Sequence, residues 1–216
     1  MRIGVLGTGM VGNTLATKLT ELGHEVRMGA RDAANEKAAE WAASAGGRAG
    51  TGTFADAADF AELVFNCTGG VVSLQALEQA GEDALRGKVL IDVANPLDFS
   101  RGMPPTLTVC NDDSLGEQIQ RRFPETRVVK AFNTINHQVM VQPSLVPGEH
   151  DLFMCGNDEG AKAQVRELAE SFGWPRERIV DLGDIQSARG MEMYLPLWLA
   201  FLRTFGTPNV NIRVAR

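Results

Sequence analysis

The spacing of three glycines near the start of the chain restricts the fold more than any other feature. Residues 2–6 form an apolar run that predicts a short buried strand, and the apolar spacing of residues 13–22 predicts a helix. Gly7, Gly9 and Gly12 stand between the two. The first allows a tight turn, the second lets a pyrophosphate approach the backbone, and the third lets the helix pack closely on the strand. This arrangement predicts a dinucleotide-binding turn.

The end of the second predicted strand distinguishes the two common dinucleotides. Residues 24–28 form this strand, and Ala30 and Arg31 lie just beyond it. An NAD site usually has an Asp or Glu here that accepts from the ribose hydroxyl, whereas a guanidinium suits the 2′-phosphate of NADP. We therefore predict NADP, with Arg31 at its phosphate. NAD is the alternative because Asp32 lies close by, although we interpret Asp32 as the N-cap of a helix over residues 33–45.

Strands and helices alternate along most of the chain. Further apolar runs predict strands over residues 63–67, 88–94, 127–132, 151–155 and 178–182. Nearly all-apolar strands are typical of a parallel sheet that helices cover on both faces. We predict an α/β fold of the Rossmann type, with a doubly wound and mostly parallel sheet.

The last part of the chain departs from this alternation. We expect a dinucleotide-binding domain over residues 1–183 and a small extension over residues 184–216, although the two could form one continuous domain. The extension is expected to be helical up to residue 205, with a kink or restart at Pro196, and to end in a strand over residues 209–214. We expect it to contact the acceptor site and a second subunit.

Composition and charge exclude several classes of function. The net charge is −6 and no basic stripe with interleaved aromatic residues is present, so nucleic acid is not an expected partner. The odd number of cysteines, three, predicts a reducing compartment, and we expect a cytoplasmic protein without a signal peptide. The three histidines lack the spacing of metal ligands. The segment 191–202 is apolar but shorter than the roughly 20 residues of a membrane span, so we expect none.

Small and polar residues follow three further predicted strands. In open parallel sheets the ligand lies beyond the carboxyl ends of the strands, where the strand order reverses. Each of these segments alone is typical of a turn. Together they predict a crevice for a nicotinamide ring and an electron acceptor, formed by Cys67, Thr68 and Gly69, by Asn95 and Pro96, and by Asn133 and Thr134.

The sequence contains no recognisable acid–base device. It lacks a Ser-x-x-x-Tyr-x-x-x-Lys array, and His137 is the one histidine candidate, in a context more typical of a helix cap. Reduction of a carbonyl requires a proton donor, whereas hydride transfer between two ring cofactors mainly requires the rings to be stacked. We therefore predict a ring-shaped acceptor and no catalytic side chain.

Four segments resemble the F420-dependent NADP oxidoreductase family: residues 7–12, 29–31, 128–135 and 184–189. This family also includes the cytosolic NADPH-binding domain of six-transmembrane metalloreductases. The resemblance covers almost the whole chain. It implies hydride transfer between NADP(H) and a deazaflavin (F420) or flavin, in a homodimer whose C-terminal helices help form the interface.

The resemblance also implies roles for single residues. Arg31 would hold the 2′-phosphate. The pyrophosphate loop would be lined by Thr8, Met10 and Val11, the ribose and nicotinamide by Cys67, Thr68 and Gly69, and the acceptor ring by Asn133, Thr134 and Ile135.

Two residues depart from the family pattern. Ala30 replaces a frequent Ser or Thr, and Asn136 replaces a Pro of the compared deazaflavin enzymes. The second departure leaves a flavin or quinone-like acceptor open. Two other functions also stay open, a non-catalytic NADP(H) sensor that signals through the C-terminal helix and a reductase of another small acceptor.

Overall fold

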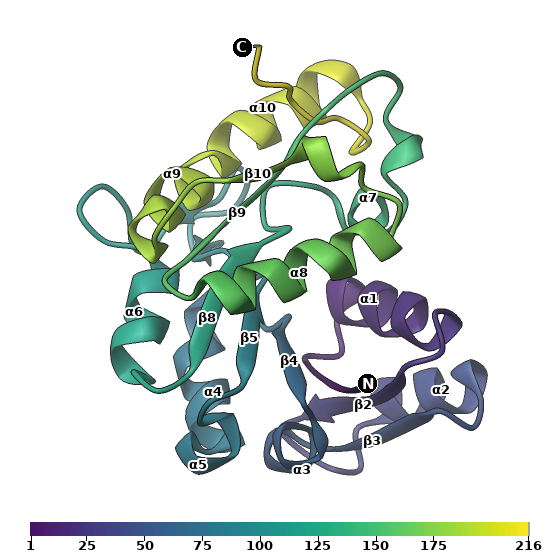
Figure 1. Cartoon of the computed structure of the whole chain (residues 1–216). Coiled ribbons are helices and arrows are strands. Elements are labelled where there is room, and N and C mark those ends of the chain that lie inside the picture. The colour runs from purple at the N-terminus through teal and green to yellow at the C-terminus, as the bar shows by residue number, and fades with distance from the viewer. Residues whose placement is uncertain (216) are drawn as a thin grey trace.

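An eight-stranded sheet lies at the centre of the computed structural model, which describes residues 1–215, and helices cover both of its faces (Figure 1). Its strands are β1 (Arg2–Leu6), β2 (Glu25–Ala30), β3 (Ala49–Thr53), β4 (Leu63–Asn66), β5 (Val89–Asp92), β8 (Arg127–Ala131), β9 (Leu152–Gly156) and β10 (Ile179–Asp181). They are arranged in the order β10-β9-β8-β5-β4-β1-β2-β3. The order reverses between β1 and β4, which makes the carboxyl ends of these two strands the expected ligand edge.

The helices are α1 (Met10–Glu21), α2 (Glu36–Ala45), α3 (Phe54–Phe60), α4 (Ser73–Ala80), α5 (Glu82–Leu85), α6 (Leu115–Arg122), α7 (His137–Val141), α8 (Glu159–Ser171), α9 (Ala188–Met193) and α10 (Leu195–Phe205). A small antiparallel hairpin of β6 (Leu97–Asp98) and β7 (Thr106–Leu107) lies beside the sheet. It lies within residues 95–112, a segment that the sequence predicts to be irregular because it contains Pro96, Gly102, Pro104 and Pro105.

The predicted doubly wound, mostly parallel sheet is confirmed. Strands β1 to β5 and β8 pair in parallel, whereas β9 is antiparallel to β8 and β10 is parallel to β9. The chain between β8 and β9 forms the short α7 and a loop instead of a long crossover helix, so it does not return to the edge from which β8 started.

Two apolar cores lie on opposite faces of the sheet because successive side chains of a strand alternate between its faces. In β4, Leu63 and Phe65 belong to one core and Val64 to the other. Helices α1, α2, α7 and α8 contribute to the first core, and α3 to α6 and α9 contribute to the second. Both faces are thus covered, which explains the nearly all-apolar strands.

The predicted starts of two helices, α1 and α2, are wrong. Helix α2 begins at Glu36, and its N-cap is Asn35, whose side chain accepts from the Ala38 N–H at 3.1 Å. Asp32 is therefore not the cap; it accepts from the Ala34 N–H in the preceding turn. Helix α1 begins three residues earlier than predicted, at Met10.

The C-terminal segment is helical as predicted but does not end in a strand. Pro196 lies in the first turn of α10, so the helix restarts there after α9. Within residues 209–214 the described chain has no strand, because isolated hydrogen bonds replace a ladder: the Asp151 N–H donates to the Ile212 carbonyl, and the Asn211 amide donates to the Asp151 carbonyl. Over residues 1–215, no helix has the length and apolar character needed to cross a bilayer.

Candidate functional site

The turn between β1 and α1 requires its glycines for different reasons. Gly7 has φ +116°, a conformation that side chains disfavour, and a Cβ on it would lie 2.6 Å from the Cys67 carbonyl oxygen. A Cβ on Gly12 would lie 2.1 Å from the Gly7 carbonyl oxygen. A Cβ on Gly9 would meet nothing within 4 Å, so the space outside the turn is open. The turn is thus closely packed on its inner side and free on its outer side.

The N-terminus of α1 opens onto this free space. No side chain caps the helix at Gly9, and its first turn has no acidic residue. The first N–H groups of a helix have no partner within it and carry a partial positive charge. These groups suit an anion such as a pyrophosphate, and Thr8, Met10 and Val11 lie at this end of the helix.

The carboxyl end of β2 presents one cation. Ala30 is buried as the last residue of the strand, and Arg31, which follows it, is exposed. Among residues 1–215 no carboxylate forms an ion pair with Arg31. Its guanidinium is therefore available to an anionic group such as a 2′-phosphate.

A cavity of about 310 Å³ lies beside the glycine turn, at the carboxyl ends of β4 and β5. It contains five of the predicted site residues and six that the sequence analysis did not name. The predicted ones are Val11, Cys67, Thr68, Gly69 and Asn95; the others are Gly70, Val71, Val93, Ala94, Leu97 and Phe99. The position of Gly70 after the strand predicted over residues 63–67 was the available signal for it. Val93 and Ala94 lie inside the strand predicted over residues 88–94, and Leu97 and Phe99 lie in the segment predicted to be irregular.

Gly70 allows the two cavity walls to touch. A Cβ on it would lie 2.0 Å from the Asn95 carbonyl oxygen and 2.7 Å from the Cα of Pro96. Pro96 itself is buried and does not line the cavity. The segments after β4 and β5 are thus held in direct backbone contact.

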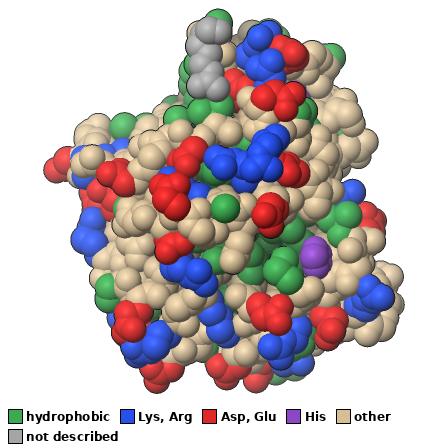
Figure 2. Space-filling view, in the orientation of Figure 1, with side chains coloured by type: hydrophobic (Ala, Val, Ile, Leu, Met, Phe, Trp, Pro, Cys, Tyr) green, Lys and Arg blue, Asp and Glu red, His purple; other side chains and the backbone are tan. Residues whose placement is uncertain are grey.

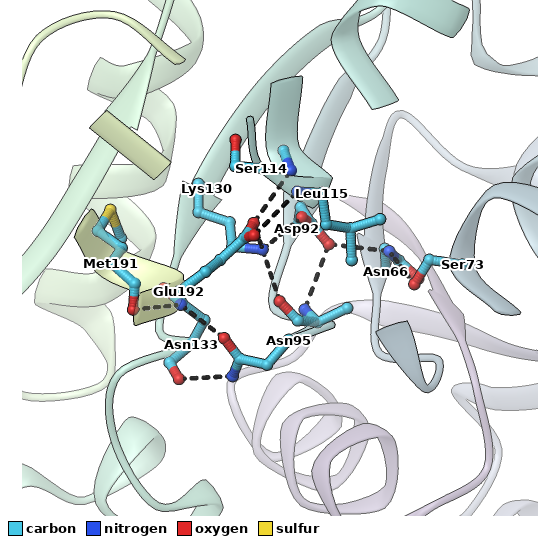
Figure 3. A network of polar contacts seen from close by, with 12 residues as sticks. Asn66, Ser73, Asp92, Asn95, Ser114, Leu115, Lys130, Asn133, Met191 and Glu192 are labelled. Carbon is cyan, nitrogen blue, oxygen red and sulfur yellow. Dashed lines mark hydrogen bonds and ion pairs between the residues drawn. The ribbon is translucent and has the colours of Figure 1, made fainter. Parts of the chain in front are cut away.

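The residues after β8 lie behind the cavity wall. Asn133 and Asn95 form two hydrogen bonds, from the Asn95 amide to the Asn133 carbonyl oxygen at 2.8 Å and from the Asn133 amide to Asn95 Oδ1 at 2.9 Å (Figure 3). Phe132, just before, has φ +64°, which is strained for a bulky residue and turns the chain sharply toward Asn95. Asn133 Oδ1 and Thr134 Oγ1 are buried without a hydrogen-bond partner, and Ile135 packs in the core.

A buried charged cluster that the sequence analysis did not predict adjoins these residues. Lys130 Nζ lies 2.7 Å from Asp92 Oδ2 and 2.8 Å from Glu192 Oε1, and all three side chains are at most 1% exposed (Figure 3). Burial lowers the pKa of Lys130, but the two carboxylates outweigh it and hold the pKa above its ordinary value. Charges at positions 92 and 130, inside otherwise apolar strands, were the available signal.

Titratable groups near the cavity are poorly suited to acid–base catalysis. Burial, with a smaller contribution from the Asp92 charge, raises the pKa of the Cys67 thiol, so this residue is a neutral thiol. His137 lies at the start of α7, its Nδ1 is 2.8 Å from Thr14 Oγ1, and burial lowers its pKa. It does not line the cavity. Asn136, where the compared enzymes have Pro, caps α7 by accepting from the Gln138 N–H.

Comparison with known proteins identifies relatives of this chain. The family model "NADP oxidoreductase coenzyme F420-dependent" matches residues 2–96. An F420-dependent NADP reductase of Methanothermobacter marburgensis is 31% identical over 99% of this chain and 98% of its own length. A protein of that name from Methanocaldococcus jannaschii is 31% identical, but the match covers 66% of this chain and 62% of the relative.

Two further similarities extend this result. Metalloreductase STEAP3 of Rattus norvegicus is 30% identical over 91% of this chain, which spans 38% of that protein. A crystal structure from Arthrobacter sp. FB24, named as a candidate F420-dependent NADP-reductase, superposes with a TM-score of 0.94 at 49% identity over the full length of both chains. The chain therefore belongs to the F420-dependent NADP reductase family of oxidoreductases.

Proposed function

We propose that this protein transfers a hydride between NADP(H) and a deazaflavin of the F420 type. One observation carries the proposal: among residues 1–215, no Asp, Glu, His, Lys, Arg or Tyr lines the cavity beside the glycine turn. Its one titratable residue is Cys67, whose raised pKa keeps it neutral. Such a cavity suits two stacked rings, between which the hydride passes without a side chain that gives or takes a proton.

The NADP(H) site proposed here runs along the edge where the strand order reverses. The turn from Gly7 to Gly12 would hold the pyrophosphate, and Arg31 the 2′-phosphate. Cys67, Thr68 and Gly69 would border the ribose and nicotinamide. The open space outside Gly9 and the uncapped start of α1 fit this placement.

We place the acceptor ring on the side of the cavity formed by the segment after β5, behind which the segment after β8 lies. Asn133 Oδ1 and Thr134 Oγ1 are buried and lack hydrogen-bond partners among the described residues, which is unfavourable unless a ligand supplies them. Amide N–H groups of the bound rings are suitable donors. Ile135 would support these residues from the core, since it is only 6% exposed.

The acceptor is tested by oxidation of NADPH in the presence of single acceptors. We expect turnover with a deazaflavin of the F420 type and little or none with FMN, FAD or a soluble quinone. Turnover with flavins alone would assign a flavin reductase. Absence of turnover with every acceptor would contradict the proposal. It would favour the hypothesis of a non-catalytic NADP(H) sensor, which the family membership disfavours.

Replacement of Arg31 by alanine should weaken NADPH binding and leave NADH binding nearly unchanged. The charge-assisted contacts of a phosphate contribute roughly 1.5–3 kcal/mol, or about 10- to 150-fold in dissociation constant. Equilibrium titration of both cofactors measures the effect. Arg176→Ala, at an arginine whose side chain is 69% exposed, serves as the control. Equal losses for NADPH and NADH in Arg31→Ala would show that Arg31 does not read the phosphate.

We also propose a homodimer that buries the exposed apolar side of α10. Leu197 is 50% exposed and Phe205 64% exposed, which is unusual for large apolar residues on one helix. Beside them, a cavity of about 390 Å³ between this helix and the β6–β7 hairpin is lined mostly by apolar residues: Met103, Pro104, Pro105, Pro196, Leu199, Ala200, Leu202 and Arg203. A second copy of the chain would cover this surface.

The Leu197→Glu variant tests the dimer. We expect light scattering to give a dimer mass for the wild type and a monomer mass for the variant, because a buried unpaired charge opposes association. Leu22→Glu, at a residue 38% exposed at the end of α1, should remain dimeric. A monomeric wild type at micromolar concentration, or a dimeric Leu197→Glu, would contradict the proposed interface.

The three cysteines are free, and two of them are partly exposed. Free thiols are typical of reducing compartments. This supports a cytoplasmic location, which we propose together with the function.

A further inference from the structure

We propose that the buried cluster of Asp92, Lys130 and Glu192 places a fixed negative charge behind the nicotinamide pocket and favours the oxidised, cationic ring. The inference rests on the proposed NADP(H) site. It assigns to these residues an electrostatic role in hydride transfer, in addition to their part in the packing of the fold.

The hydrogen bonds of the cluster indicate that both carboxylates are ionised. Asp92 Oδ1 accepts from the Asn66 amide at 2.8 Å and from the Ala94 N–H at 3.2 Å, and Oδ2 accepts from Lys130. Glu192 Oε2 accepts from the Leu115 N–H at 2.8 Å. These carboxylate oxygens thus only accept hydrogen bonds. None of the bonds requires a protonated carboxyl group to donate to a carbonyl oxygen.

Glu192 completes this pattern through its second oxygen. Its Oε1 accepts from the Gly116 N–H at 3.0 Å and lies 2.8 Å from Lys130 Nζ. The three side chains therefore carry two negative charges and one positive charge. One negative charge remains, partly offset by the start of α6.

This charge lies directly behind the cavity wall, because Ala94, a lining residue, contacts the cluster. Figure 3 shows the cluster beside Asn95, which also lines the cavity. Ala94, which lines the cavity, is hydrogen-bonded to the cluster through both of its backbone groups: its N–H donates to Asp92, and its carbonyl oxygen accepts from Lys130 at 2.5 Å. Asn66 connects Asp92 to Thr68, whose hydroxyl donates to Asn66 Oδ1 at 2.7 Å. Since Asp92 is 0% exposed, solvent and salt screen its field poorly.

The field acts on the step in which charge develops. When NADPH gives up a hydride from its ring, the hydrogen and its electron pair move to the acceptor ring, and the nicotinamide changes from neutral to positively charged. The acceptor ring gains one negative charge, which a proton from solvent neutralises. A fixed negative charge stabilises the cationic ring relative to the neutral one. For one unit charge at about 10 Å and an effective dielectric constant of about 20, the preference is about tenfold.

The test compares the dissociation constants of NADP⁺ and NADPH. Asp92→Asn should shift their ratio about tenfold in favour of NADPH, and Glu192→Gln should shift it in the same direction. A merely structural defect would weaken the binding of NADP⁺ and of NADPH by the same factor. Ser73→Ala is the matched control: it removes the hydrogen bond between Asn66 and the Ser73 hydroxyl without a change of charge, so its ratio should stay that of the wild type. An unchanged ratio in both carboxylate variants would overturn the inference.

If neither carboxylate variant folds, the affinities of the wild type for NADP⁺ and NADPH test the inference. A buried charge predicts that NADP⁺ binds more tightly than NADPH and that the ratio stays constant from low to high salt, while both affinities fall. Tighter binding of NADPH, or a ratio that changes with salt, would overturn the inference. Failure of the proposed NADP(H) site is distinguishable, because the protein would then bind neither form, and failure of the proposed hydride transfer would appear as binding without turnover. Normal binding and turnover with an unchanged ratio would reject the electrostatic role alone.

Discussion

Replacing Lys130 with methionine should lower the free energy of unfolding by about 3–5 kcal/mol, the range observed when one partner of a buried ion pair is removed. Lys130 is the one cation of its cluster, and its loss leaves Asp92 and Glu192 facing each other in an environment without solvent. Removal of the ammonium also leaves the Ala94 carbonyl without its donor. Chemical denaturation followed by fluorescence or circular dichroism measures the change.

Arg122→Met is the control for this experiment. Arg122 also contacts two carboxylates, Glu78 and Glu82, but these side chains are 45–49% exposed. Exposed ion pairs contribute about 0–1 kcal/mol, so this variant should be nearly as stable as the wild type. If Lys130→Met costs no more than Arg122→Met, the buried cluster does not stabilise the fold as described here.

Replacing Gly12 with alanine should damage both the fold and cofactor binding. Its Cβ would lie 2.1 Å from the Gly7 carbonyl oxygen, a backbone atom that cannot move without opening the turn. Overpacking of this kind costs roughly 1–3 kcal/mol of unfolding free energy. Because α1 must move away from β1, its N–H groups leave the pyrophosphate position, and we expect NADPH affinity to fall by at least about 100-fold, or 2.7 kcal/mol.

Gly9→Ala separates these two effects. A Cβ here would meet nothing within 4 Å, and the backbone has an ordinary φ of −76°, so stability should change by less than about 1 kcal/mol. The new methyl group would nevertheless occupy the space proposed for the pyrophosphate, and NADPH affinity should fall. Titration and denaturation of both variants check this. Full NADPH affinity in Gly9→Ala would place the pyrophosphate elsewhere.

Local sequence patterns account for most of the sheet. The apolar runs predict β1, β4, β5 and β8 because strands covered on both faces need apolar side chains on both faces. They carry no information on direction, so the reversal of β9 was not predictable. Residues 209–214 alternate like a strand, but a strand also requires a partner along its length, and only isolated bonds to Asp151 are present.

Boundaries and side-chain partners were harder to predict. Asp32 and Asn35 both have side chains that can cap a helix, and the choice between them depends on where the chain turns after β2. Lys130 and Asp92 stand out in the sequence as charges within apolar strands. Their pairing depends on β8 lying next to β5, and the contact with Glu192 depends on the packing of α9, neither of which a local pattern contains.

In the candidate site, too, local sequence patterns predict some residues, whereas others depend on the packing of distant segments. The turn from Gly7 to Gly12 and the segment from Cys67 to Gly69 lie at one edge, because the reversal of strand order brings the ends of β1 and β4 together. Phe99 lines the cavity because it lies in the β6–β7 hairpin, which no hydrophobic periodicity in the sequence predicts. The roles proposed for Arg31, Asn133 and Thr134 stay predictions until ligand binding is measured.

The most direct test of hydride transfer follows an isotope. NADPH that carries deuterium at the transferred position of the nicotinamide is mixed with the protein and a deazaflavin of the F420 type, and the reduced deazaflavin is examined by mass spectrometry. Direct transfer between stacked rings predicts that the deuterium is recovered in the reduced deazaflavin. Release of the deuterium to water, or no reduction of the deazaflavin, would contradict the account.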